Sequence, residues 1–340
     1  MSIRHLANFF ADRGLLVDIV MRPQPDDHFL FKELSKDITV KQINAKGKVK
    51  LFFGLLQYVL NERPDVVLGL DCRAGLLTSW LSFVPGLRSR LWAEFCAELN
   101  ENQTRSLRRI ARRCNGVIAV SQGIADDFRR LTKTPAEQVR VIHNLAVTSD
   151  IAKQSKARID HRWLKGDDHP VVCGVGRLVP EKGFEYLIRA FAVVREQHAE
   201  AKLILIGKGP LHESLCRLAD ELGVHDSIDF LGFQENPWAY MARADLFVMS
   251  SLAEAFGNVL AEALSLGTPV VATDCPFGPR EILENGRYGQ LVPPADSMAL
   301  ADAMLATLAA PLSEEHLIAG AQRFTEATAG QKYLETLGFV

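Results

Sequence analysis

The chain has 340 residues, 48% of them hydrophobic, so it can bury a large core and is expected to form two domains rather than one. Thirty-nine basic and forty-one acidic side chains leave a formal net charge of -2, which provides no global field for binding nucleic acid. The six cysteines are scattered, with no C-x-x-C pair and no grouping with histidine. We therefore expect buried reduced thiols and no metal site.

Two segments bear on location. The opening residues, Met1 to His5, lack the long apolar core of a secretory signal, and the longest apolar run, Leu51 to Leu60, is too short to span a bilayer. These features predict a cytoplasmic protein.

The first half of the chain alternates helical and extended patterns. A helix is predicted over Ile3 to Phe10, and Gly14 ends it. Buried strands are predicted at Leu15 to Val20, Pro64 to Leu70, Gly116 to Val120 and Val139 to Ile142. Longer helical segments separate these runs, which indicates βαβ units.

The second half has the same alternation in a cleaner form. Its predicted strands are Val171 to Gly174, Leu203 to Ile206, Ile228 to Leu231, Leu246 to Met249, Pro269 to Ala272 and Gly289 to Val292. These runs are apolar throughout, as is typical of parallel strands covered by helices on both faces. The polar, charged segment 148–169 between the halves is the predicted domain boundary.

These patterns predict an α/β protein with two doubly wound domains in tandem. Ligands of such sheets bind at the carboxyl ends of the strands, and two facing domains place the site in the cleft between them. The loops that follow strands are therefore the places to look for functional residues.

The turn after the first strand of the second half carries two cations, Arg177 and Lys182. A planar guanidinium and a mobile ammonium suit the adjacent phosphates of a diphosphate. Two isolated loop cations are more often solvated surface charges, so this motif alone decides little. A dinucleotide fingerprint is excluded because Val179 stands where a third small residue is needed, and Gly207-Lys208-Gly209-Pro210 lacks the spacing of a P-loop.

The segment after the strand ending at Met249 contains two glutamates eight residues apart, Glu254 and Glu262. If a helix begins near Asn258, Glu254 lies in the preceding loop and Glu262 about one turn inside the helix. The free amides of Phe256, Gly257 and Asn258 then lie between the carboxylates. Carboxylates accept hydrogen bonds from hydroxyls and helix amides attract phosphate, which is the layout that a sugar nucleotide needs. By itself such a pair is usually surface decoration.

Taken in order, the motifs resemble one family. They are G-R-L-V-P-E-K-G, G-K-G-P, F-L-G-F, E-A-F-G-N-V-L-A-E-A-L-S-L-G-T-P-V-V-A-T-D and G-P-R-E-I-L. This series is similar to the retaining glycosyltransferases of family 4, which have the GT-B fold of two Rossmann-like domains facing a cleft. The resemblance is dense from about Val171 to Leu308 and thinner before it.

The resemblance implies a domain plan. Residues 1–147 are an acceptor-side Rossmann-like domain, 148–169 a linker, and 170–322 a donor-binding domain, while 323–340 form a helix that crosses back to the first domain. It also implies site residues. Arg177, Lys182 and Glu254 are the expected catalytic set: the two cations hold the donor diphosphate and Glu254 meets the transferred sugar. Donor binding is completed by Glu262 on the ribose, Phe233 near the nucleobase, and the amides of Phe256, Gly257 and Asn258.

The expected reaction moves a hexose or N-acetylhexosamine from a nucleotide diphosphate sugar, most commonly a UDP-sugar, to a glycan or polyprenyl-linked acceptor in surface polysaccharide or lipopolysaccharide synthesis. No D-x-D occurs in the sequence, so we expect no metal and no cofactor. Arg177 and Lys182 must then stabilise the charge that grows on the leaving diphosphate.

This sequence departs from the family in two places. Family members open with a strand and a Gly-rich loop, whereas Met1 falls on the helix that should follow, so the first domain is expected to be incomplete at its start or the start codon to be misassigned. Where relatives often carry a histidine stands Phe95, which cannot relay a proton; Glu94 is the neighbouring alternative.

A basic stripe is predicted on one helix of the first half, where Arg105, Arg108, Arg109 and Arg112 recur at spacings of three and four. It suits anionic lipid headgroups or a phosphorylated polyprenyl acceptor, which predicts peripheral binding at the inner membrane face. A solvated helix face is the plainer alternative.

Two other classes of function stay open at this level. One is a catalytically silent GT-B module that binds a nucleotide sugar or a partner, and the other is a sugar-nucleotide epimerase that shares the fold. Transfer requires an acceptor, an epimerase converts its donor without one, and a binding module does neither.

Overall fold

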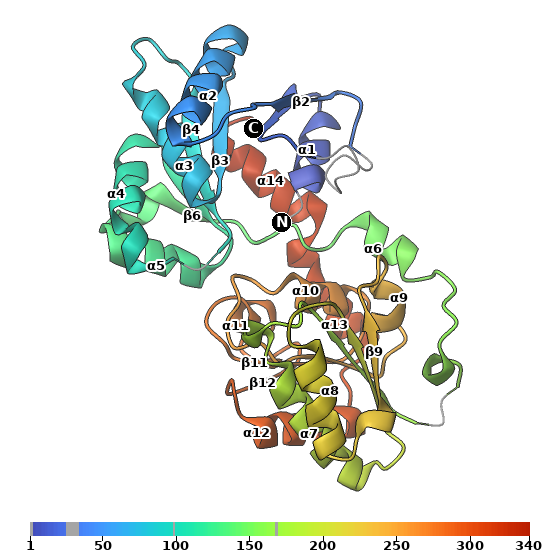
Figure 1. Cartoon of the computed structure of the whole chain (residues 1–340). Helices are drawn as coiled ribbons and strands as arrows, with labels where there is room; N and C mark the ends of the chain where they lie inside the picture. Colours follow the sequence, from blue (N-terminus) through green and yellow to red (C-terminus); the bar gives the residue numbers. More distant parts are fainter. Residues whose placement is uncertain (1–2, 25–33, 98, 167–168) are drawn as a thin grey trace. The chain divides into compact units, whose positions relative to one another are not determined.

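The computed structural model describes residues 3–24, 34–97, 99–166 and 169–340. It divides into unit 1, Met1–Leu145 with Thr325–Val340, and unit 2, Ala146–Phe324 (Figure 1). The described part of the predicted linker, 148–166 and 169, therefore belongs to unit 2, and the segment 325–340 returns to unit 1. Met1 and the linker residues 167–168 lie outside the described residues.

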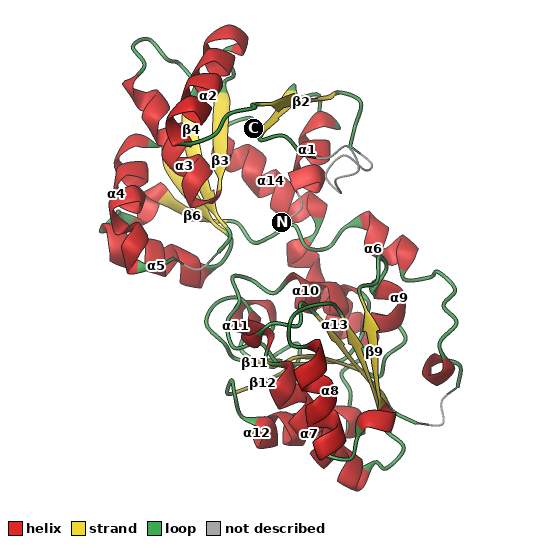
Figure 2. Cartoon of the chain, viewed as in Figure 1, coloured by secondary structure: helices red, strands yellow, loops and turns green. Residues whose placement is uncertain are grey.

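Unit 2 is built on one parallel sheet of six strands in the order β12-β11-β10-β7-β8-β9 (Figure 2). The strands are β7 (Val171–Val175), β8 (Lys202–Ile206), β9 (Ile228–Gly232), β10 (Leu246–Met249), β11 (Val270–Thr273) and β12 (Gln290–Val292). The first strand of this unit, β7, is thus central, between β8 and β10. This is the doubly wound arrangement, in which the strand order reverses beside the first strand.

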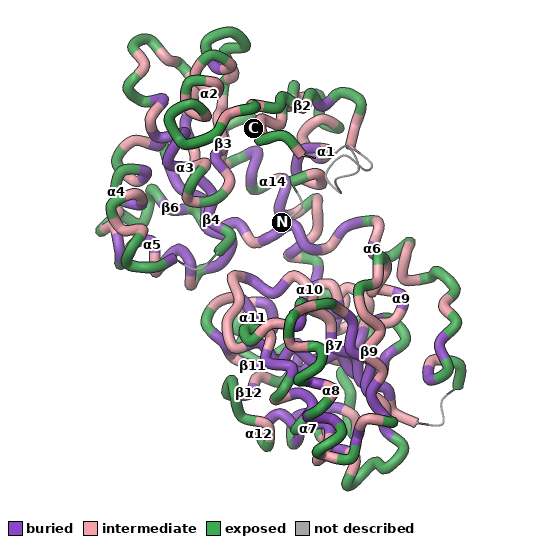
Figure 3. The backbone as a smooth tube through the Cα atoms, in the orientation of Figure 1, coloured by how far each residue is buried: buried purple, intermediate pink, exposed green. Residues whose placement is uncertain are grey.

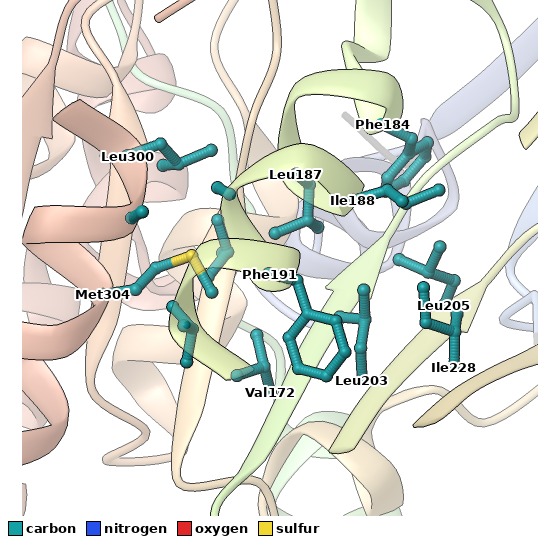
Figure 4. Close-up of a cluster of buried hydrophobic side chains, with 14 of the residues drawn as sticks. Val172, Phe184, Leu187, Ile188, Phe191, Leu203, Leu205, Ile228, Leu300 and Met304 are labelled. Carbon is teal, nitrogen blue, oxygen red and sulfur yellow. The ribbon is translucent and has the colours of Figure 1, made fainter. Parts of the chain in front are cut away.

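The core of unit 2 lies where α7 (Phe184–Gln197) and α12 (Ser297–Ala309) pack on the sheet. In α7 the apolar residues Phe184, Leu187, Ile188, Phe191 and Val194 recur at helical spacing, so one face of the helix is buried. Figure 4 shows Phe184, Leu187, Ile188 and Phe191 against β7 and β8, with Leu300 and Met304 of α12 beside them. In Figure 3 the central strands of this unit are buried along their length.

The remaining helices of unit 2 connect or flank these strands. They are α6 (Ser149–Gln154), α8 (His212–Glu221), α9 (Trp238–Met241), α10 (Asn258–Ser265), α11 (Pro279–Ile282) and α13 (Glu314–Ala321). Of these, α10 directly follows the loop after β10, so its first residues lie at the carboxyl edge of the sheet.

The strands of unit 1 form two parallel sheets. One pairs β1 (Val17–Met21) with β2 (Ile38–Gln42), and the other has the order β3-β4-β5-β6. The four strands of the second sheet are β3 (Val66–Leu70), β4 (Arg90–Phe95), β5 (Gly116–Ala119) and β6 (Val139–Val141). Among the residues that the structure describes, no strand joins β1 to β3.

Helices cover both faces of the larger sheet. On one face α2 (Lys48–Glu62), α3 (Asp71–Trp80), α4 (Thr104–Arg113) and α5 (Gln122–Thr132) form a layer in which each helix contacts the next. Gly75 of α3 lies close to Ala93 of β4, where a Cβ would come within 2.9 Å of the alanine side chain. On the other face α1 (Ile3–Ala11) and α14 (Glu326–Leu337) pack together, with Leu6 and Tyr333 in one cluster.

All ten strands predicted from the sequence are present, with bounds that differ by at most a few residues. The sequence interpretation missed β2 and β4. The prediction of buried cysteines is wrong for Cys96, which is exposed, and holds for Cys114, Cys173 and Cys275. The helix expected at the end of the chain is α14.

Candidate functional site

The first part of the candidate site is the turn after β7. A short 3-10 turn, Pro180–Lys182, follows Arg177, and it ends at Gly183, whose φ is 60°. The ammonium of Lys182 forms an ion pair with the carboxylate of Glu254, which lies in the loop after β10. Their side chains are 21% and 10% exposed, so this pair is much less solvated than a surface salt bridge.

Gly183 is required where the two loops meet. A Cβ at this position would lie 2.2 Å from the carbonyl oxygen of Ser250, which no side chain could tolerate. Two hydrogen bonds join the same loops: Ser250 Oγ donates to the Lys182 carbonyl at 3.0 Å, and the Leu252 amide donates to the Glu181 carbonyl at 2.8 Å. The backbone therefore holds Lys182 against the loop that carries Glu254.

Glu254 has a second partner. Ser251 Oγ donates a hydrogen bond of 2.7 Å to Glu254 Oε1, the oxygen that also faces Lys182. The other carboxylate oxygen of Glu254 accepts no hydrogen bond from the described residues. Thr273 at the end of β11 fixes this loop, because its hydroxyl donates 2.5 Å to the Ser251 carbonyl. The site thus holds an oriented carboxylate with one oxygen available to a ligand hydroxyl.

The helix α10 begins at Asn258, as predicted, after Gly257 with φ 98°. Glu254 lies ahead of the helix and Glu262 inside it. The role predicted for the Phe256 backbone amide stays a prediction, and the Phe256 side chain is buried against Phe324, with ring centroids 5.3 Å apart. Only the backbone of Phe256 can therefore face a ligand.

Glu262 is held by an aromatic partner. Trp238 of α9 donates its indole N–H to Glu262 Oε2 at 2.8 Å. Burial raises the pKa of Glu262 from 4.5 to about 7, and the bond from Trp238 opposes that rise. The carboxyl oxygens of Glu262 can accept hydrogen bonds from the hydroxyls of a diol.

Two predicted residues stand apart from these contacts. Arg177 is exposed, and its guanidinium has no partner among the described residues. Phe233 is 63% exposed at the end of β9. A third cation, Lys208, lies between their loops: its carbonyl accepts from the Leu178 amide at 3.0 Å, and its side chain passes 3.6 Å from where a Cβ of Gly232 would lie.

Sequence reasoning did not identify three of these residues. Ser251 and Trp238 orient the two glutamates, and Lys208 adds charge beside the Arg177 loop. The signal for Lys208 is its place in G-K-G-P, because this lysine, like Arg177, stands in a loop directly after a strand. No sequence pattern indicates a role for Trp238, because it lies 24 residues before Glu262 in a four-residue helix.

The proline-rich loop after β11 packs on the same region. Gly278, with φ 82°, approaches so closely that a Cβ would lie 1.8 Å from the Phe256 carbonyl oxygen. Asp274 pairs with Arg280 within the loop, with one hydrogen bond of 3.0 Å from Arg280 Nε. The loop therefore braces the segment ahead of α10.

In unit 1, Glu94, the alternative to a histidine at the position of Phe95, is buried. Its side chain on β4 is 1% exposed and accepts a 2.8 Å hydrogen bond from the hydroxyl of Tyr333 on α14. Burial raises the pKa of Glu94 from 4.5 to about 7. Glu94 therefore ties α14 to the sheet and is not open to a substrate. Its neighbour Phe95 is buried too, packed on Phe128.

The basic stripe lies on α4 as predicted, with Leu107 and Ile110 buried beneath it. Arg105, Arg108, Arg109 and Arg112 are all exposed. Within the described ranges, no three His, Cys, Asp or Glu side chains gather closely enough to hold a metal ion. In the same residues, no helix is long and apolar enough to cross a bilayer.

The fold defines the class of protein. A crystal structure of Anabaena Alr3699/HepE in complex with UDP superimposes over all of this chain and 95% of its own, with a TM-score of 0.82 and 24% identity. A lipopolysaccharide outer core galactosyltransferase, WaaB, superimposes with a TM-score of 0.78 and 20% identity over 99% of this chain and 94% of its own. The chain has the GT-B fold.

Family models place the chain more narrowly. The model of the group 1 glycosyl transferases matches residues 155–324, and that of glycosyltransferase family 4 matches residues 1–149. This chain therefore belongs to the group 1 glycosyltransferases of family 4.

Two relatives show the range of similarity. The lipopolysaccharide core biosynthesis glycosyltransferase LpsE of Rhizobium meliloti is 29% identical over 88% of this chain and 82% of its own length. An uncharacterized glycosyltransferase of Methanocaldococcus jannaschii is 44% identical, but over 44% of this chain and only 37% of its own length.

Proposed function

We propose that this chain transfers a sugar from a nucleotide diphosphate sugar bound at the carboxyl edge of the unit 2 sheet. The observation that carries the proposal is the Lys182–Glu254 pair ahead of α10, with Glu262 held inside the same helix. Along a single ligand, one carboxylate then faces the sugar, the cation faces the diphosphate, and the second carboxylate faces the ribose.

The chemistry assigned to the site is stabilisation of a leaving diphosphate. As the bond between the sugar and the β-phosphate breaks, the phosphate oxygen takes the electron pair and its negative charge grows. Lys182 and Arg177 bind this charge more strongly in the transition state than in the bound donor, which lowers the barrier. The acceptor hydroxyl loses its proton as it attacks, and the departing diphosphate is a base able to take that proton.

Finer features of the activity extend this proposal. We infer a retaining, metal-independent transferase whose donor is a UDP-hexose or UDP-N-acetylhexosamine. The HepE structures in complex with UDP and UDP-glucose support the donor, and similarity to LpsE supports an acceptor in lipopolysaccharide or surface polysaccharide synthesis, either a glycan or a polyprenyl-linked sugar.

The donor is testable with a panel of nucleotide sugars scored by thermal shift and calorimetric titration. One ligand should raise the melting temperature of the wild-type protein in proportion to its occupancy. Lys182→Ala should reduce that shift, whereas Lys165→Ala, which removes an ion pair to Asp160 at 2.5 Å on the surface of the same unit, should not. Equal shifts in both variants would remove Lys182 from the site.

Two further measurements address the mechanism. NMR of the product should show the anomeric configuration of the donor, and inversion would contradict the retaining assignment. Turnover should be unchanged after dialysis against a chelator, and loss of turnover that added Mg²⁺ or Mn²⁺ restores would contradict metal independence.

A nucleotide-sugar-binding module without transferase activity is the second candidate, because the strands of unit 1 form two sheets instead of one. Such a module would give the thermal shift of a specific donor without consuming it. Conversion of the donor in the absence of any acceptor would instead identify an epimerase.

A further inference from the structure

A cavity lies at the amino-terminal edge of the unit 2 sheet, and its volume is about 180 Å³. It is bordered by Val270 and Gln290, the first residues of β11 and β12, by Thr307 in the last turn of α12, and by Leu317 of α13. All six strands of this sheet are parallel, so the loops that carry Lys182 and Glu254 leave from the opposite edge. The cavity is therefore separate from the candidate site described above.

Most of the cavity wall is apolar. Pro269, Leu312 and Leu317 contribute to it, and Leu317 is fully buried whereas Leu312 is 41% exposed. An apolar cavity of about 150 Å³ holds a molecule of the size of benzene, so this one admits a ligand of roughly six to eight heavy atoms. Water alone fits such a space poorly, because a buried water needs several polar partners. The size and the wall together indicate a small organic molecule.

Thr307 adds a buried polar group to this wall. The residue is 8% exposed, and its hydroxyl oxygen is buried and has no hydrogen-bond partner among the residues that the structure describes. An unpaired buried hydroxyl is unfavourable, since it has lost its bonds to water without replacement. An oxygen atom on a ligand in the cavity would supply the missing partner, because a hydroxyl can both donate and accept.

Arg287 gives the cavity its charge, because it is the only ionisable side chain among the described residues that line it. Its side chain is 63% exposed, so it stands at the opening. Arg287 Nη1 lies 3.1 Å from one carboxylate oxygen of Glu284, and Arg323 Nη1 lies 2.7 Å from the other. Two guanidinium groups thus share one carboxylate, which leaves N–H donors and positive charge for an anion.

We propose that this cavity is a second ligand site of the protein, for a small organic carboxylate that also carries a hydroxyl group. The carboxylate meets Arg287 at the opening, the alkyl body lies against Leu312 and Leu317, and the hydroxyl pairs with Thr307. Each part of this ligand answers one feature of the wall. A purely apolar molecule would leave Thr307 unpaired, and an inorganic anion would leave the apolar wall uncovered.

The ligand class is tested by calorimetric titration of the full-length protein with α-hydroxyisovalerate, which has eight heavy atoms, within the roughly six to eight that the cavity admits. This probe should bind saturably with a Kd of about 1 mM or lower. Isovalerate, which lacks the hydroxyl, should bind about three- to tenfold more weakly. The neutral α-hydroxyisovaleramide should bind about tenfold more weakly, because it lacks the charge that faces Arg287. The absence of saturable binding would overturn the proposal.

Variants locate the bound probe. Thr307→Val keeps the shape of the side chain and should weaken α-hydroxyisovalerate about three- to tenfold while leaving isovalerate unchanged. Its melting temperature without ligand should not fall, since the lost hydroxyl had no partner, so weaker binding cannot come from a damaged fold. Ala310→Phe places a ring at the cavity wall and should abolish binding, whereas Ala309→Phe, an exposed neighbour outside the wall, should bind like the wild type.

Two results would overturn the assignment. One is an affinity for α-hydroxyisovalerate in Thr307→Val and Ala310→Phe that equals that of the wild type. The other is loss of this binding in Lys182→Ala, which would place the carboxylate in the proposed donor site. Binding retained in Lys182→Ala is the expected result, and it makes the outcome independent of the proposed transferase activity.

Discussion

Both units are built on parallel strands, but they differ at the centre of the sheet. In unit 2, β8 and β9 lie on one side of β7, and β10, β11 and β12 lie on the other. Unit 1 has the corresponding blocks, β1 with β2 and β3 to β6, but no described strand stands between them. Burial follows this difference: every residue of β10 and β11 is buried, whereas β1 has none and β3 has one. In unit 2 the central strand β7 joins the two halves of the sheet into one continuous base for the loops.

The proposed donor residues lie on loops that follow neighbouring strands of the unit 2 sheet. There the loops after β7, β10 and β11 are held together by close backbone contacts at Gly183 and Gly278 and by the hydrogen bond of Thr273. In unit 1 the polar feature at the carboxyl end of β3 is Asp71, a non-glycine residue with φ 85°. Its carboxylate accepts hydrogen bonds from the amides of Arg73 and Ala74, so it serves the start of α3.

The largest effect is expected from removing positive charge from the loops of unit 2. Lys182→Ala and Arg177→Ala should each lower kcat/KM on the order of 10²–10³-fold, because each removes a cation from the leaving diphosphate. Steady-state transfer assays measure the loss, and circular dichroism should show an unchanged fold. Arg189→Ala, an exposed arginine on α7, serves as control and should keep wild-type turnover.

The second expectation concerns the close contact between loops. Gly278→Ala should destabilise unit 2 by about 2–4 kcal/mol, because a Cβ would lie 1.8 Å from the Phe256 carbonyl oxygen at a left-handed φ. Gly223→Ala is the matched control: φ is 67° there, but nothing lies within 4 Å, so only about 1 kcal/mol of backbone strain is expected. Urea denaturation measures both, and equal losses would mean that the loops do not depend on this contact.

Stability should depend on pH through the buried carboxyl groups of both units, Glu94 in unit 1 and Glu262 in unit 2. The buried Glu94 keeps its proton to about pH 7 in the folded state, whereas its ordinary pKa is 4.5. Its contribution to stability is therefore complete below pH 4.5 and is lost as the pH rises through 7, by up to about 3 kcal/mol. Glu94→Gln should reduce this dependence in denaturation curves measured from pH 5 to 8, and Glu262, whose pKa is also raised to about 7, should account for the part that remains. Tyr333→Phe should cost about 1 kcal/mol and keep the slope, and a flat wild-type profile would contradict the assignment.

The smallest effect is expected in hydrogen exchange. Backbone amides of β1 and β3 should exchange about tenfold or more faster than those of β7 and β10, because the described residues give β1 and β3 a ladder on one side only. Mass spectrometry of proteolytic fragments would measure this. Equal protection in the two sets of strands would show that the divided sheet of unit 1 is as rigid as that of unit 2.

The sequence predicted the fold well where burial left a simple pattern. Most strands of unit 2 are apolar on both faces and appear as continuous runs, whereas β9 contains Asp229 and β12 begins with Gln290. The missed strand β4 reads R-L-W-A-E-F, and Glu94 interrupts the apolar pattern because Tyr333, distant in sequence, supplies its partner. The missed strand β2 reads I-T-V-K-Q, and only Ile38 is buried.

The candidate site was predictable in part. Spacing placed Glu254 ahead of a helix and Glu262 within it, and the structure agrees. No local pattern could indicate that Lys182 pairs with Glu254, 72 residues away, since the β7 and β10 loops meet only because their strands are neighbours. The sequence could not indicate that the side chain of Phe256 is buried either, because its partner Phe324 is distant in sequence, at the last position of unit 2.

The two ends of unit 2 are joined by hydrogen bonds. The amides of Ala146 and Val147, where unit 2 begins, both donate to the carbonyl of Phe324, where it ends, at 3.1 and 3.0 Å. Unit 2 is therefore a closed loop of sequence whose two ends are fastened together. An excised fragment of residues 146–324 should fold without a splice and retain donor affinity, whereas unit 1 would need its two segments joined by a new peptide link.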